Sequence, residues 1–152
     1  MVLMKILAID YGSKRIGLAI SDELGITARP LAVVERRNLD RDLDFLENVI
    51  RENNVEQIVL GLPLRLDGTR GIQCEKVERF AAVLKERFPI PLVFWDEALS
   101  TWEADELMMT AGIKSRKRRK MVDKIAAGII LQSYLNSLHA SRKSDGTRGE
   151  GR

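Results

Sequence analysis

Over its first 35 residues the chain alternates apolar and polar positions, a pattern that predicts three consecutive strands. Lys5–Asp10 is a short apolar run that ends in an acid and leads into a glycine turn. Ile16, Leu18 and Ile20 then alternate with small residues, as in the second arm of a hairpin. Pro30–Glu35 gives the third strand, so we expect an antiparallel meander.

The next part of the chain alternates between helix and strand patterns. A helix capped by Asn38 and ending near residues 53–54 carries apolar residues at helical spacing: Leu39, Leu43, Leu46 and Ile50. Buried-type strands are expected at Gln57–Gly61 and Pro91–Trp95, with a helix over Gln73–Phe88 between them. Such a series implies parallel strands joined by right-handed crossovers, and therefore an α/β fold with a mixed sheet.

The last third of the chain predicts two more helices and a tail. Ser100 and Glu103 form a capping box for one helix, and the other runs over about residues 120–138. The remaining residues are rich in Ser, Gly and charge. We expect a single domain over residues 1–139, followed by a disordered tail over residues 140–152.

Composition excludes several classes of site. No run approaches the roughly 20 apolar residues that span a bilayer, so we expect a cytoplasmic protein without a membrane partner. The chain has one cysteine, Cys74, and one histidine, His139, which excludes an internal disulfide and zinc clusters built on these residues. Carboxylates and cationic side chains must therefore perform any chemistry.

Three acids are placed where they can meet. Asp10 ends the first strand, Glu97 follows the Pro91–Trp95 strand, and Asp123 lies below an apolar helix stripe that contains Ala127. Loops after strands converge at one edge of an α/β sheet, and carboxylate oxygens suit Mg²⁺ or Mn²⁺. We predict that Asp10, Glu97 and Asp123 are metal ligands and catalytic residues. Singly, each acid is also explained as a turn former, a loop charge or a helix-start residue.

Positive charge gathers near these acids. Residues 112–152 hold eleven Lys or Arg against three Asp or Glu, which indicates an anionic partner, with nucleic acid the leading candidate. The alternative for the densest stretch, residues 114–120, is a solvated loop. The residues predicted to contact phosphate are Lys14, Arg15, Arg65, Arg70, Arg116, Lys117, Arg118, Arg119, Lys120 and Lys124. For Trp95 and Trp102 we expect packing in preference to base stacking.

Five short motifs match a known pattern. They are Ile9-Asp10-Tyr11-Gly12, Gly17 with Ser21-Asp22, Gly61-Leu62-Pro63 with Asp67-Gly68-Thr69, Trp95-Asp96-Glu97, and Asp123-Lys124-Ile125-Ala126-Ala127. Together they resemble the YqgF (RuvX) family, bacterial RNase H-like proteins related to Holliday-junction resolvases. The match covers about residues 4–138 in the family's motif order. In the family's pattern, Arg commonly stands where this chain has Ala98 and Asn where it has Arg65.

The resemblance implies an RNase H-like fold, a mixed five-stranded sheet flanked by helices. It also implies a cytoplasmic, metal-dependent nuclease that processes the 5′ end of 16S rRNA, with the family's acids at Asp10, Glu97 and Asp123. Three alternatives stay open: a resolvase of four-way DNA junctions, a non-catalytic RNA-binding factor, and a phosphotransferase related to actin and sugar kinases. Paired cuts in a junction favour a homodimer, whereas trimming of one end does not.

Overall fold

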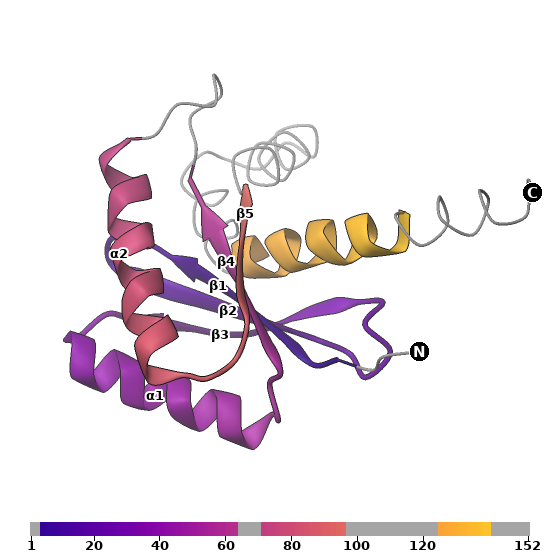
Figure 1. The fold of residues 1–152 in the computed structure, drawn as a ribbon, viewed down its shortest axis with the longest axis horizontal. Coiled ribbons are helices and arrows are strands. Elements are labelled where there is room, and N and C mark those ends of the chain that lie inside the picture. The colour runs from indigo at the N-terminus through magenta and orange to yellow at the C-terminus, as the bar shows by residue number, and fades with distance from the viewer. Residues whose placement is uncertain (1–3, 64–70, 97–124, 141–152) are drawn as a thin grey trace, which may run out of the picture.

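The computed structural model describes residues 4–63, 71–96 and 125–140 (Figure 1). Its strands are β1 (Ile6–Tyr11), β2 (Arg15–Ser21), β3 (Ala28–Glu35), β4 (Gln57–Leu62) and β5 (Leu92–Asp96). Its labelled helices are α1 (Leu39–Glu52), between β3 and β4, and α2 (Ile72–Arg87), between β4 and β5. A further helix, the C-terminal helix, spans residues 125–140.

The five strands form one mixed sheet in the order β3-β2-β1-β4-β5. β1, β2 and β3 pair antiparallel, whereas β4 pairs parallel with both β1 and β5. The predicted meander, the parallel pairing of the later strands and the mixed five-stranded sheet of an α/β fold are therefore confirmed. The third strand begins at Ala28, earlier than expected, because Pro30 lies on an edge strand, next to a register shift, where a missing N–H is tolerated.

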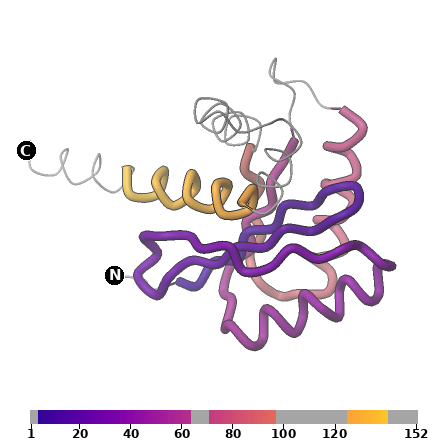
Figure 2. Tube along the Cα trace, turned by 180° about the vertical axis from the view of Figure 1, so that it is seen from behind, coloured from indigo at the N-terminus to yellow at the C-terminus, as the bar shows by residue number. Residues whose placement is uncertain are grey.

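Helices cover both faces of this sheet, which gives three layers (Figures 1 and 2). Alternate residues of β1 face opposite sides. Leu7 and Ile9 belong to a core shared with α1 and α2. Ile6 and Ala8 belong to a second core, under the C-terminal helix. Asp10 follows the same alternation, so it lies on the face of the C-terminal helix.

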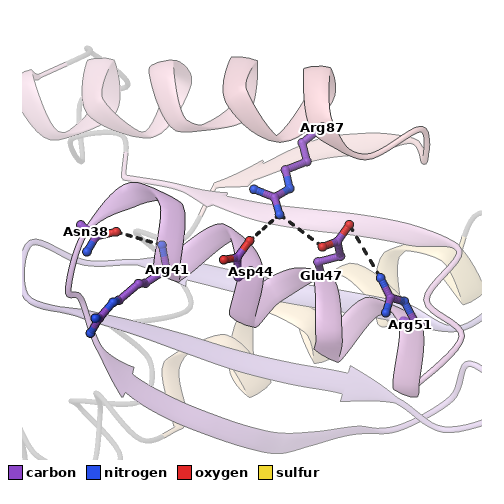
Figure 3. A network of polar contacts seen from close by, with 6 residues as sticks. All are labelled: Asn38, Arg41, Asp44, Glu47, Arg51 and Arg87. Carbon is purple, nitrogen blue, oxygen red and sulfur yellow. Dashed lines mark hydrogen bonds and ion pairs between the residues drawn. The ribbon is translucent and has the colours of Figure 1, made fainter.

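Local signals explain how α1 begins and how α2 is held against it. The Asn38 side chain accepts a hydrogen bond from the backbone N–H of Arg41 at 2.9 Å, which confirms the predicted cap. Further along, Arg87 of α2 donates to Asp44 at 2.6 Å and to Glu47 at 3.2 Å of α1 (Figure 3). This double ion pair joins the two helices at one end of their contact.

The C-terminal helix runs back along β1. Leu138 and His139, near its end, line a pocket with Met4 and Ile6, near the beginning of β1. The start of the helix is therefore directed toward the other end of β1, where Asp10 lies (Figure 1). Three fully buried residues anchor the helix, each worth about 1.5–3 kcal/mol of burial: Ile130, Leu131 and Leu135.

Several sequence predictions fall outside the described residues. They are the helix after Ser100, the first residues of the helix predicted over 120–138, and the tail beyond residue 140. Among the helices that the structure does describe, none combines the length and apolar character needed to cross a membrane.

Candidate active site

Asp10 lies in a pocket of about 270 Å³ at the end of β1. The pocket is formed by the turn between β1 and β2 and by the neighbouring strands, and its lining residues are Asp10, Gly12, Ser13, Lys14, Arg15, Gly17 and Val33. Asp10 is half-buried, whereas Lys14 and Arg15 are exposed. The structure thus brings together three of the residues predicted from the sequence, one acid and two cations.

Space beside the Asp10 carboxylate comes from a glycine. Gly17 of β2 is the residue directly opposite Asp10 in the antiparallel register. Directly opposed residues project to the same face, so a side chain at Gly17 would stand next to the carboxylate. The glycine leaves this position open, and the next residue across the sheet is Val33 of β3.

The turn that carries Lys14 is held tightly. The backbone N–H of Gly12 donates to the carbonyl oxygen of Arg15 at 2.9 Å. A Cβ atom at Gly12 would lie 2.8 Å from that same oxygen, closer than van der Waals contact permits. Arg15, which we expected in the turn, is the first residue of β2 because it pairs with Glu35 of β3.

Arg36 supports this turn from the end of β3. Its Nη1 donates to the carbonyl oxygens of Gly12 at 3.0 Å and Ser13 at 3.2 Å. Its backbone N–H donates to the carbonyl of Lys14 at 2.9 Å. Its guanidinium lies over the Tyr11 ring, 4.3 Å from the centroid. Sequence reasoning missed Arg36, although a meander places the residue after its third strand beside the first turn.

Tyr11 forms the floor beneath Arg36. Its other ring face stacks on Phe80 of α2, with centroids 3.9 Å apart and planes at 10°. Its carbonyl oxygen accepts a hydrogen bond from Nε2 of Gln73 at 3.1 Å. Burial raises the pKa of the Tyr11 hydroxyl, an effect that Arg36 partly opposes. The phenol therefore stays neutral and acts as a packing surface.

Ser21 and Asp22, which belong to one of the five motifs, stabilise the backbone where β1 begins and β2 ends, away from Asp10. The Ser21 hydroxyl is buried and accepts from the backbone N–H of Ile6 at 2.8 Å. The Asp22 carboxylate accepts from the backbone N–H of Ile26 at 2.8 Å and from the Thr27 hydroxyl at 3.1 Å. Burial alone would raise the pKa of Asp22, but these donors together lower it.

The contacts of Phe94 and Trp95 show which face of the sheet each residue near the end of β5 lies on. Phe94 lies near Lys85 of α2, 5.6 Å from its Nζ, so it faces α2. Trp95 faces the C-terminal helix, because its Nε1 donates to the Ser133 hydroxyl at 3.1 Å and its ring meets Tyr134 edge-on. The predicted packing role of Trp95 is confirmed. Trp95 thus lies on the same face of the sheet as Asp10. By strand alternation, Asp96 lies on the same face as Phe94.

The remaining predicted site residues lie outside the described part of the chain. They are Glu97, Asp123, Arg65, Arg70, Arg116, Lys117, Arg118, Arg119, Lys120 and Lys124. Within the described ranges no group of three His, Cys, Asp or Glu is arranged to hold a metal ion. The donor chemistry of the Asp10 pocket nevertheless fits a hard divalent cation, because its acidic ligand is a carboxylate and its lining contains neither His nor Cys.

The family model and the sequence relatives agree on one family, and a solved structure shows a similar fold. The family model described as "RuvX: Holliday junction resolvase" matches residues 4–137. A protein of Syntrophus aciditrophicus (strain SB), named "Putative pre-16S rRNA nuclease", is 52% identical over 135 residues, which cover 89% of this chain and 90% of that protein. A protein of Carboxydothermus hydrogenoformans with the same name is 47% identical over 133 residues, 88% of this chain and 96% of its own. RuvC of Thermus thermophilus has a similar fold, with a TM-score of 0.53 at 15% identity, covering 90% of this chain and 97% of RuvC.

Proposed function

The chain belongs to the RuvX family, and from this membership we propose that it hydrolyses phosphodiester bonds of nucleic acid, in processing the 5′ end of pre-16S rRNA. The observation that carries the proposal is the pocket in which the Asp10 carboxylate lies with Lys14 and Arg15. A carboxylate that can bind a metal and cations that can bind phosphate are the groups this hydrolysis requires. The name shared by the relatives directs the proposal to rRNA.

We assign Asp10, Glu97 and Asp123 as the catalytic and metal-binding acids. Strand alternation supports Glu97 over its neighbour: Trp95 shares the face of Asp10, and Glu97 is two residues further along. Helical periodicity supports Asp123, because it precedes Ala127 by four residues, and Ala127 is buried against the sheet. Both arguments extend described elements by one or two residues.

Divalent Mg²⁺ or Mn²⁺ held by these acids would supply an activated water and stabilise charge on the reacting phosphate. The protein's own side chains do the rest. Asp10 is fixed at a strand end, which gives a ligand the rigidity that catalysis needs. Lys14 and Arg15 bind and orient the phosphate, and Arg36 holds the turn that carries Lys14.

Further phosphate contacts are proposed for two segments. One is the segment between β4 and α2, which contains Arg65 and Arg70. The other is the basic stretch of sequence before the C-terminal helix, which contains Arg116, Lys117, Arg118, Arg119, Lys120 and Lys124. Such contacts add affinity and register without sequence choice. A cytoplasmic location follows from the proposed rRNA substrate.

A second substrate class has its own support, because the matching family model is described as a Holliday junction resolvase. Cleavage of four-way DNA junctions would use the same acids. Paired, symmetric cuts would require a two-fold homodimer, whereas rRNA end processing would not. Sedimentation of the protein with each substrate measures whether it binds as a monomer or a dimer, and a dimer on the four-way junction would favour the resolvase.

The test is a cleavage assay on purified protein, with a pre-16S rRNA 5′ fragment and a four-way DNA junction offered side by side. We expect cleavage of the RNA that requires Mg²⁺ or Mn²⁺ and stops with EDTA. Asp10→Asn should abolish it, whereas Asp40→Asn, the same change on an exposed residue of α1, should not. Junction cleavage in place of RNA cleavage would select the second substrate. RNA binding without cleavage of either would refute the enzyme and favour a non-catalytic RNA-binding factor.

A further inference from the structure

A second recess lies immediately beside the Asp10 pocket, on the opposite face of the sheet. Its volume is about 240 Å³, and its lining residues are Tyr11, Arg36, Leu39, Lys76, Arg79, Phe80 and Val83. Tyr11 follows Asp10 in β1 and belongs to the core under α1 and α2. This recess, which we call the groove, therefore begins one residue beyond Asp10, where the chain turns toward β2.

Among the residues that the structure describes, three cations line this groove and no carboxylate does. Arg36 is half-buried, whereas Lys76 and Arg79 are exposed. Across the part of the chain that the structure describes, neither the Lys76 nor the Arg79 side chain forms a hydrogen bond or an ion pair. Glu75 stands four residues before Arg79, the spacing that favours an ion pair along a helix, yet the two do not pair.

The other end of the same helix pair is built differently. There Arg87 is neutralised by Asp44 and Glu47, and Glu47 also lies 3.8 Å from Arg51 (Figure 3). α1 and α2 thus balance their charges one helical turn beyond Val83, which lines the groove, whereas the side chains of Lys76 and Arg79 have no such partners among the described residues. The carboxylate of Asp42 in α1 lies near enough to act on the Tyr11 hydroxyl, but Asp42 does not line the groove. Exposed cations that have no carboxylate partner make a positively charged surface, and such a surface attracts an anion.

We propose that this groove binds backbone phosphates of the nucleic-acid substrate, in a segment that flanks the scissile bond. The proposal rests on the proposed nuclease function and adds a second contact surface to it. Lys76 and Arg79 supply exposed charge, while the apolar floor of Leu39 and Val83 suits a sugar rather than a second ion. Arg36 uses Nη1 for the turn carbonyls, and a guanidinium has further donors that can meet phosphate.

The position of the groove indicates the shape of this substrate. The Asp10 pocket lies on the face of the C-terminal helix, and the groove lies on the face of α1 and α2. A nucleic acid that reaches both must bend around the end of β1 or present two diverging strands there. A forked fragment presents two diverging strands without having to bend, so we expect it to contact both surfaces more fully than an unstructured strand does.

The test compares two double variants that lose the same charge. Lys76→Gln with Arg79→Gln removes the groove cations, and Arg51→Gln with Lys85→Gln removes exposed cations elsewhere on α1 and α2. Glutamine keeps helix propensity at all four positions. Binding to a forked pre-16S rRNA fragment and to an unstructured strand of equal length is measured in EDTA over a salt series.

We expect the groove variant to bind the forked fragment more weakly, with the slope of log Kobs against log salt reduced by about 1.4–1.8, roughly 0.7–0.9 per lost phosphate contact. The control variant should keep the parent slope. Binding to the unstructured strand should change less, and cleavage of a short single-phosphodiester substrate should stay at the parent rate.

The two proposals fail in different ways. A parent protein that neither binds nor cleaves nucleic acid would refute the nuclease function itself. If the parent cleaves and the groove variant keeps its salt slope, the groove does not bind substrate. If both double variants lose the same affinity and salt slope, the effect comes from overall charge, and the groove is not a specific binding site. A groove variant that binds RNA normally but loses binding to a polyglutamate peptide would assign the groove to an acidic protein and overturn the proposal.

Discussion

Replacing Arg36 with alanine removes the side chain that supports the turn beside Asp10. The variant loses two hydrogen bonds, to the carbonyls of Gly12 and Ser13, and the cation–π contact with Tyr11. The backbone bond to Lys14 remains. Each of the two half-exposed hydrogen bonds contributes about 1 kcal/mol and the cation–π contact about 0.5–1 kcal/mol, so we expect a loss of about 2.5–3 kcal/mol.

Two measurements separate support of the fold from support of the pocket. In a chain of this size such a loss lowers the melting temperature by about 5–12 °C. A displacement of Lys14 by about 1 Å should in addition lower kcat by up to roughly a hundredfold at saturating metal. Arg36→Lys keeps the charge but not the forked donor geometry, so we expect an intermediate kcat.

Arg37 provides the matched control, because it is exposed and adjacent in sequence. Arg37→Ala should change neither the melting temperature nor kcat appreciably. An Arg36→Ala protein that melts lower but cleaves at the parent kcat would refute the reasoning, because the turn would then be independent of its support. Assays are run well below the melting temperature of each variant, so that unfolding does not enter kcat.

Asp10→Asn should leave the metal-free melting temperature unchanged or raised and should shrink the melting shift produced by Mg²⁺ or Mn²⁺; an unchanged shift would remove Asp10 from the metal site. Asp22→Asn should destabilise the protein at neutral pH by less than about 1 kcal/mol, since the site is near the surface. Because folding lowers the pKa of Asp22, this contribution is present above its ordinary value of 3.8 and is lost as pH falls through the lowered pKa, which urea titrations at several pH values can follow. Replacing Arg116, Arg118 and Arg119 with alanine should weaken RNA binding equally for all sequences and reduce the salt slope by roughly 0.7–0.9 per lost contact; an unchanged slope would leave the segment as a solvated loop.

Local signals in the sequence were sufficient for most of the secondary structure. The Asn38 cap and the alternation in β1 act over a few residues, and both appear in the structure as expected. Of the predicted apolar stripe of α1, Leu43 and Leu46 are buried and Ile50 is half-buried, whereas Leu39 is exposed. Boundaries shifted where pairing between strands intervened. Arg15 joined β2 because Glu35 lies opposite, and β3 extended to Ala28 because the edge of the sheet accommodates Pro30.

From the sequence, only the site residue at the end of a predicted strand could be identified. Asp10 was identified because a strand-end acid before a glycine turn lies at the edge where ligands bind. Arg36 and Gln73 were missed because each acts on a carbonyl distant in sequence, and neither residue type nor spacing marks such a partner. The groove was missed for the same reason, since it joins residues of β1, the end of β3, α1 and α2.

The sequence by itself determined which segments become strands and helices, their order, and the family to which the chain belongs, because caps, periodicity and short motifs are encoded within a few neighbouring residues. Only the tertiary structure decided which face of the sheet each side chain takes and which charges are compensated. Arg87 and Arg79 lie on the same helix. The Arg87 side chain forms ion pairs with carboxylates of α1, whereas the Arg79 side chain forms none with the described residues. The reason is physical: the electrostatic environment of a side chain depends on distances in space, and packing of the two helices on the sheet sets those distances.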